Sequence, residues 1–103
     1  MQAVFEAVSD PTRRVILECL RDQGPLSITT LSDPLPISRQ AVTKHLDVLE
    51  EAGLIEKIRR GRERIHRLQA GPLRELDDWL APYAAFWDER LDRLRAHLDG
   101  DDE

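Results

Sequence analysis

The chain has 103 residues and a net charge of −5, with 34% charged and 41% hydrophobic side chains. This size and composition predict one soluble globular domain whose single core leaves little room for a deep active-site cleft. No apolar run approaches membrane-spanning length, no secretion signal opens the chain, and a lone cysteine excludes an internal disulfide. We therefore expect a cytoplasmic protein that is neither an enzyme nor dependent on a cofactor.

The charge is distributed unevenly along the chain. Residues 36–68 carry eight Lys and Arg against five acids, whereas residues 69–103 carry four Arg against ten acids. Within residues 57–67, six basic side chains accompany one Glu. Because phosphate contacts depend on local positive charge more than on the charge of the whole chain, the middle segment indicates a nucleic-acid-binding surface.

Two helices are expected in the first quarter of the chain. The first covers residues 2–8. The second begins at Asp10-Pro11, because an Asp side chain can cap free amide groups and a Pro fits the first helical position. Gly24-Pro25 predicts its end.

Residues 27–52 predict a helix-turn-helix. Its first helix is short, because Pro34 and Pro36 interrupt it. Its second helix is capped by Ser38 and is expected to stop at Gly53, where glycine tolerates a left-handed backbone.

The solvent-facing side of that second helix suits DNA. Gln can pair with adenine, Thr can meet a base edge or a thymine methyl, and Arg and Lys reach guanine or phosphate. A neighbouring His is expected either to pack or to contact phosphate. The candidate DNA-binding residues on this helix are Ser38, Arg39, Gln40, Thr43, Lys44 and His45. The alternative is an ordinary amphipathic surface helix, which the preceding helix and the following hairpin argue against.

Residues 54–68 predict a β-hairpin, or wing, that turns at Gly61-Arg62. The register pairs Ile58 with Ile65, Glu56 with Arg67 and Arg60 with Glu63 on one face, and Lys57 with His66 and Arg59 with Arg64 on the other. Because opposed like charges cost stability, we interpret the second face as one presented to an anion. The wing's basic residues are expected to contact the DNA backbone, with Arg62 also a candidate for the adjacent minor groove, and they are Lys57, Arg59, Arg60, Arg62, Arg64 and Arg67. The candidate DNA-binding residues selected among them are Arg59, Arg60, Arg62 and Arg64. The alternative is a solvated hairpin.

Residues 72–98 predict a long helix with an apolar residue every three or four positions. A heptad-like stripe that extends beyond the core of a small domain indicates a homodimer. The expected dimer contacts come from the first and last helices, and they are Val4, Phe5, Leu76, Trp79, Leu80, Tyr83, Trp87, Leu91 and Leu94. A second interpretation, compatible with the first, is a pocket for an unknown small-molecule effector lined by Trp79, Tyr83, Phe86 and Trp87.

The expected order α-α-α-α-β-β-α is mainly helical with a small β-hairpin, and it describes a winged helix-turn-helix with one helix added at each end. Three segments carry a resemblance to a known family: Ser9-Asp10-Pro11-Thr12-Arg13-Arg14-Val15-Ile16-Leu17, Ile37-Ser38-Arg39-Gln40-Ala41-Val42-Thr43-Lys44-His45-Leu46, and Leu49-Glu50-Glu51-Ala52-Gly53-Leu54-Ile55. The chain resembles the ArsR/SmtB family of winged-helix repressors over about residues 3–98. The resemblance implies a homodimer joined through its first and last helices, operator binding by the fourth helix and the wing, and repression that a signal relieves.

The sequence departs from the metal-sensing members of that family. The third helix carries no Cys pair and the last helix carries one His, His97, so no metal site is expected. The aromatic last helix looks like that of a metal-independent branch. The sequence thus predicts a homodimeric repressor bound to an inverted-repeat operator in double-stranded DNA. Two alternatives remain: a winged-helix protein-interaction module that does not bind DNA, favoured by the overall acidity, and a metal-responsive repressor.

Overall fold

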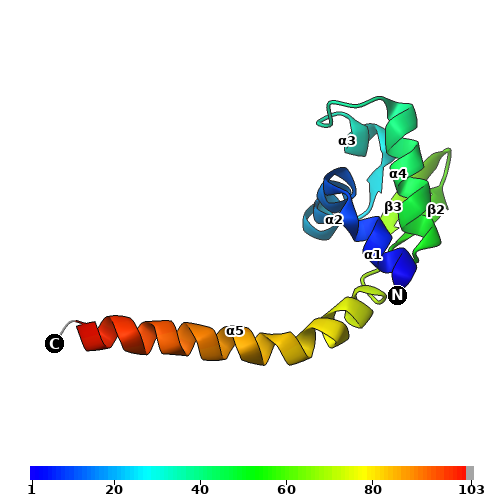
Figure 1. Ribbon diagram of the computed structural model, residues 1–103. Helices are drawn as coiled ribbons and strands as arrows, with labels where there is room; N and C mark the ends of the chain where they lie inside the picture. Colours follow the sequence, from blue (N-terminus) through cyan, green and yellow to red (C-terminus); the bar gives the residue numbers. More distant parts are fainter. Residues whose placement is uncertain (102–103) are drawn as a thin grey trace.

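Five helices and a three-stranded antiparallel sheet make up residues 1–101, which the computed structural model describes. In chain order they are α1 (Gln2–Ser9), α2 (Pro11–Gln23), β1 (Leu26–Ser27), α3 (Ile28–Ser32), α4 (Arg39–Glu51), β2 (Ile55–Arg60), β3 (Glu63–Leu68) and α5 (Leu73–Asp101). Figure 1 shows α1 to α4 and the sheet gathered into one body, from which α5 projects as a rod. The predicted winged helix-turn-helix is confirmed, with β1 as an addition.

The helix starts follow the predicted caps. The Asp10 carboxylate accepts a hydrogen bond from the amide of Arg13 at 3.0 Å, ahead of Pro11 at the first position of α2. This hydrogen bond to the charged form is the main reason why the pKa of Asp10 lies below its ordinary value. The Ser38 hydroxyl likewise accepts from the amide of Ala41 at 3.1 Å and opens α4.

The core lies where α1, α2, α3 and α4 meet the base of the wing. Each helix contributes one apolar stripe, as the helical spacing of its buried residues requires. The largest fully buried side chains are Ile16, Val42, Leu31, Leu46, Leu49 and Leu54. Burial of the α4 residues among them, Val42, Leu46 and Leu49, fixes the rotation of α4 about its own axis. It therefore also fixes which residues of α4 face water.

The wing has the predicted register, including Lys57 opposite His66 and Arg59 opposite Arg64. Gly61 at the turn has φ of +64°, as a type II′ turn requires at its first central position. The third strand was not predicted. β1 pairs with β3 on the side away from β2, and it places Leu26 opposite His66.

The interpretation of the Lys57 and His66 face as one presented to an anion is wrong for these two residues. His66 is 3% exposed, and its Nδ1 lies 3.3 Å from the carbonyl oxygen of Leu26. Lys57 is turned toward α4, where its Nζ lies 2.7 Å from the carboxylate of Asp47. The inner end of this face packs against the helices, and only the Arg59 and Arg64 end is exposed.

The buried imidazole makes stability dependent on pH. Burial lowers the pKa of His66, so the unfolded chain binds a proton there more readily than the folded chain does. We expect the free energy of unfolding, measured by urea denaturation, to decrease as the pH falls through and below about 6.5. The His66→Asn variant, which keeps a donor for Leu26 but cannot titrate, should show a smaller decrease. Equal pH dependence in the two proteins would contradict this assignment.

Candidate nucleic-acid interface

The fourth helix presents one polar face to solvent. Val42, Leu46 and Leu49 are buried on its inner side. Apart from His45, the candidates at its N-cap and in its first two turns are all exposed, and they are Ser38, Arg39, Gln40, Thr43 and Lys44. Steps of one, three and one residue along a helix keep the last four on one side, so the structure brings the expected base-contacting groups together.

Two of these side chains also make contacts within the chain. The Arg39 guanidinium donates to the hydroxyl oxygen of Thr29 on α3, and the Thr43 hydroxyl donates to the Arg39 carbonyl at 3.0 Å. Arg39 therefore ties the two helices of the helix-turn-helix together. Among the described residues, Gln40 and Lys44 have no hydrogen bond or ion pair from their side chains, which leaves both available for DNA.

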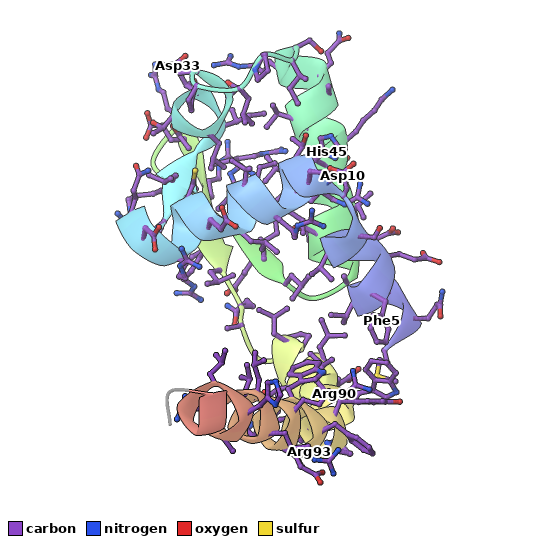
Figure 2. All side chains as sticks on the ribbon, turned by 60° about the vertical axis from the view of Figure 1, so that its left-hand side comes forward. Phe5, Asp10, Asp33, His45, Arg90 and Arg93 are labelled. Atoms are coloured by element: carbon purple, nitrogen blue, oxygen red, sulfur yellow. The ribbon has the colours of Figure 1, made fainter. Side chains whose placement is uncertain are left out.

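His45 is turned toward α2 and not toward the exposed face. Its Nδ1 lies 3.3 Å from Nη1 of Arg13 and 3.9 Å from the carboxylate of Asp10, and the side chain is partly buried. Figure 2 shows His45 and Asp10 next to each other where α2 begins. Of the two roles expected for His45, this geometry supports packing, and the contact with phosphate stays a prediction.

The Arg13 and Arg14 side chains perform a structural task that sequence analysis missed. Arg13 donates to the carbonyl oxygens of Glu6 and Ala7 at 2.9 and 2.8 Å, while Arg14 donates to those of Val8 and Ser9 at 2.8 and 3.1 Å. The last carbonyls of a helix lack partners within it and carry partial negative charge, which two guanidinium groups satisfy. The available signal was an Arg pair placed just after a helix break.

The wing separates into engaged and unengaged basic residues. Lys57 pairs with Asp47 and Glu50, and Arg67 pairs with Glu56. Four arginines of the wing were predicted to contact the DNA backbone, and they are Arg59, Arg60, Arg62 and Arg64. All four are exposed, and none forms an ion pair in the part of the chain that the structure describes. The wing therefore offers four solvated guanidinium groups, and one of them, that of Arg64, lines the same hollow as Thr43 of α4.

The long helix exposes most of its apolar stripe. Its large apolar residues from Trp79 to Leu98 are between 40% and 63% exposed. Near its start, Trp79 meets Phe5 of α1 edge to face, with ring centroids 5.6 Å apart. Figure 2 places Phe5 at the end of α1 that adjoins α5. Val4 is 4% exposed and lies in the core of its own chain, so its predicted dimer contact is corrected.

Three of the four residues expected to line an effector pocket surround a shallow hollow on α5. The hollow has a volume of about 300 Å³ and is lined by Tyr83, Phe86, Trp87 and Arg90, all from this one helix. The effector itself stays a prediction. Across the described side chains, no three His, Cys, Asp or Glu residues gather in a way that could hold a metal ion. No described helix is both long and apolar enough to cross a membrane.

Comparison with known proteins gives matches over most of the chain. The model of a helix-turn-helix domain family matches residues 8–58. An HTH-type transcriptional regulator of Bacillus subtilis, YuzN, is 40% identical over 80 residues, which are 72% of this chain and 87% of the relative. An ArsR-like transcriptional regulator from Rhodococcus sp. RHA1 of known structure is 39% identical, with a TM-score of 0.69 over 90% of this chain and 87% of that one. The chain belongs to the ArsR/SmtB-type winged helix-turn-helix regulators.

Membership in the ArsR/SmtB-type family makes the protein a DNA-binding transcriptional regulator. A further relative is the transcriptional repressor SdpR of Bacillus subtilis, which is 32% identical over 80 residues, or 78% of this chain and 88% of the relative. DNA is thus the partner of this fold.

Loss of the Arg13 side chain should loosen the corner between α1 and α2. We expect Arg13→Leu to lower the free energy of unfolding by about 2 kcal/mol, because the carbonyls of Glu6 and Ala7 lose their donor and the hydrogen bond to Ala7 is partly buried. Urea denaturation measures the change. Arg21→Leu is the matched control, since Arg21 is exposed and pairs only with its neighbour Asp22. A similar loss in both variants would show that the corner is not specifically held by Arg13.

Proposed function

We propose that the protein is a homodimeric repressor that binds an inverted-repeat operator through α4 and the wing. The proposal rests on two observations: Gln40 and Lys44 of α4 are exposed and make no side-chain hydrogen bond or ion pair among the described residues, and the wing carries four exposed arginines, of which Arg64 lines the same hollow as Thr43 of α4. In this arrangement each α4 enters a major groove, and the wing contacts the flanking phosphates. Two copies related by a two-fold axis would then meet half-sites about one helical turn (~34 Å) apart.

The roles within this surface differ by chemistry. Gln40 and Lys44 are free to reach base edges, because neither side chain is held within the described part of the chain, and an amide can pair with both hydrogen-bonding positions of adenine. Arg62 lies at the tip of the wing and is the residue best placed for phosphate or for the adjacent minor groove. We assign base selection to α4 and the sequence-independent share of affinity to the wing.

The dimer follows from the exposed stripe on α5. Large apolar side chains that stay in water along a projecting helix are a surface for a partner, and a symmetric oligomer covers the same surface on both copies. Charge favours an antiparallel arrangement. Residues 73–89 carry one Arg against five acids, whereas residues 90–98 carry three Arg against one acid. A two-fold axis across α5 would place the basic segment of each copy beside the acidic segment of the other.

Repression is proposed because a dimer on an operator blocks the access of polymerase to the same DNA. The relative SdpR is named a transcriptional repressor, which supports repression and not activation as the proposed effect on transcription. We propose that the operator lies in the DNA immediately upstream of the protein's own gene. The alternative is an operator that controls a neighbouring operon.

Two substitutions should separate base selection from phosphate contact. We expect Gln40→Ala to reduce the preference for the upstream fragment over a random duplex by about tenfold, because one good base contact contributes about 1–3 kcal/mol of discrimination. Arg62→Ala should weaken binding to both duplexes by a similar factor and reduce the salt dependence of affinity. Fluorescence anisotropy titrations at several salt concentrations measure both effects. The opposite pattern would overturn the two assignments.

A single charge on the stripe should separate the copies. We expect Leu91→Glu to weaken dimerisation by at least about thirtyfold, because a symmetric interface buries this position twice. Sedimentation equilibrium measures the association against the 11.9 kDa mass of one chain. Ala85→Glu is the matched control, since Ala85 is exposed on the opposite side of α5. A wild-type protein that sediments as a monomer at micromolar concentration would refute the proposed dimer.

A further inference from the structure

One basic residue of the wing differs from the others in its surroundings. Nζ of Lys57 lies 2.7 Å from Oδ1 of Asp47 and 3.7 Å from Oε1 of Glu50, both on α4. The Lys57 side chain is 24% exposed, whereas those of Asp47 and Glu50 are 57% and 44% exposed. The ammonium group therefore lies between β2 and α4, while the carboxylates remain in partial contact with solvent.

The position of Asp47 makes this contact relevant to DNA. Asp47 follows Thr43 by four residues and Lys44 by three, so it continues the exposed face of α4 that we propose for the major groove. Thr43 and Arg64 line the same small hollow, of about 210 Å³, as Lys57. In the proposed complex, a carboxylate on this face would repel the phosphate backbone unless a countercharge accompanies it.

Lys57 supplies that countercharge. His66 lies opposite it across the strands, but burial lowers the pKa of His66 and favours its neutral form. Arg64 forms no ion pair with either carboxylate within the described residues. With Lys57 removed, α4 would therefore present two uncompensated negative charges at the end of its proposed DNA-binding face.

We propose that Lys57 is a positioning residue for DNA binding, which offsets one of the two negative charges of Asp47 and Glu50 and holds the wing against α4 without contacting phosphate itself. This inference rests on the proposed DNA contacts of α4 and the wing. The ion pair joins β2 to α4. It thereby holds the proposed phosphate-contacting residues of the wing in a defined position relative to the proposed base-contacting residues of α4. The role differs from that of Arg62, which has no partner in the described chain and is proposed to meet phosphate directly.

A double-mutant cycle distinguishes the two modes of action. One background is the natural chain, and the other carries Asp47→Asn together with Glu50→Gln. If Lys57 acts through the carboxylates, Lys57→Met should weaken binding in the first background by about tenfold and in the second by less than about twofold, since coupled residues do not contribute additively. If Lys57 contacted phosphate directly, the loss would be equal in both backgrounds, and the proposal would be overturned.

Arg62→Met is the matched control, because it removes the same charge from the same hairpin. Its effect should be the same in both backgrounds. Lys57→Arg, which keeps the charge, should bind within about twofold of the wild type, since a guanidinium can make the same pair. The probe is a fluorescent duplex from the region upstream of the gene, with a random duplex of equal length beside it, at one fixed ionic strength.

The cycle also separates failure of this inference from failure of the proposed interface. If Arg62→Met leaves binding unchanged in both backgrounds, the proposed interface fails. If Arg62→Met weakens binding and Lys57→Met does not, or does so equally in both backgrounds, only the role of Lys57 fails. Urea denaturation verifies the fold of each variant, and Met retains most of the aliphatic stem of this partly exposed lysine.

Discussion

The buried face of α4 determines how the rest of the molecule can meet DNA. Val42, Leu46 and Leu49 are withdrawn from water by the helices and by the base of the wing. Burial of three such side chains contributes about 5–8 kcal/mol, which far exceeds the energy of any single surface contact on this helix. Rotation of α4 about its axis is therefore excluded, and the side chains opposite the core must point outward together.

The corner between α1 and α2 holds α4 from a second direction. Arg13 satisfies the terminal carbonyls of α1 and approaches the ring of His45 on α4, whose Nδ1 also lies 3.9 Å from the capping carboxylate of Asp10. One guanidinium thus links the helix that contacts α5 with the helix that carries the candidate DNA contacts. The capped start of α2 thus connects two regions of the chain that have different proposed roles.

Local charge explains how an acidic chain can belong to a family of DNA-binding proteins. The segment that forms α4 and the wing is basic, and Lys57 offsets one of the two negative charges that Asp47 and Glu50 bring to α4. Another eight acids lie on α5, which projects away from the body in Figure 1. At physiological salt, exposed charges are screened over about 8 Å, so acids along the distant part of α5 have little influence on phosphates at the wing.

The features that sequence predicted depend on short spacings along the chain. A cap joins residues three positions apart, a hairpin register follows from its turn, and a buried stripe repeats every three or four residues, so Ser38, Gly61 and Val42 could be placed without coordinates. Two features that it missed join residues that are further apart in the sequence. β1 pairs with β3 across forty positions, and Lys57 reaches Asp47 from another element. No local pattern distinguishes a lysine that will meet a carboxylate from one that will meet a phosphate.

The projecting part of α5 makes helix formation and dimerisation interdependent in the proposed assembly. α5 has 29 residues, and beyond its first turns its large apolar side chains are exposed. Isolated helices gain little stability in water from backbone hydrogen bonds alone, and most helical stability in proteins comes from packing of an amphipathic face. A second copy that covers this face would stabilise the helix. It would also bring the two α4 helices together in one dimeric DNA-binding unit. Anything that loosens α5 would then also weaken operator binding, because each α4 alone meets only one half-site.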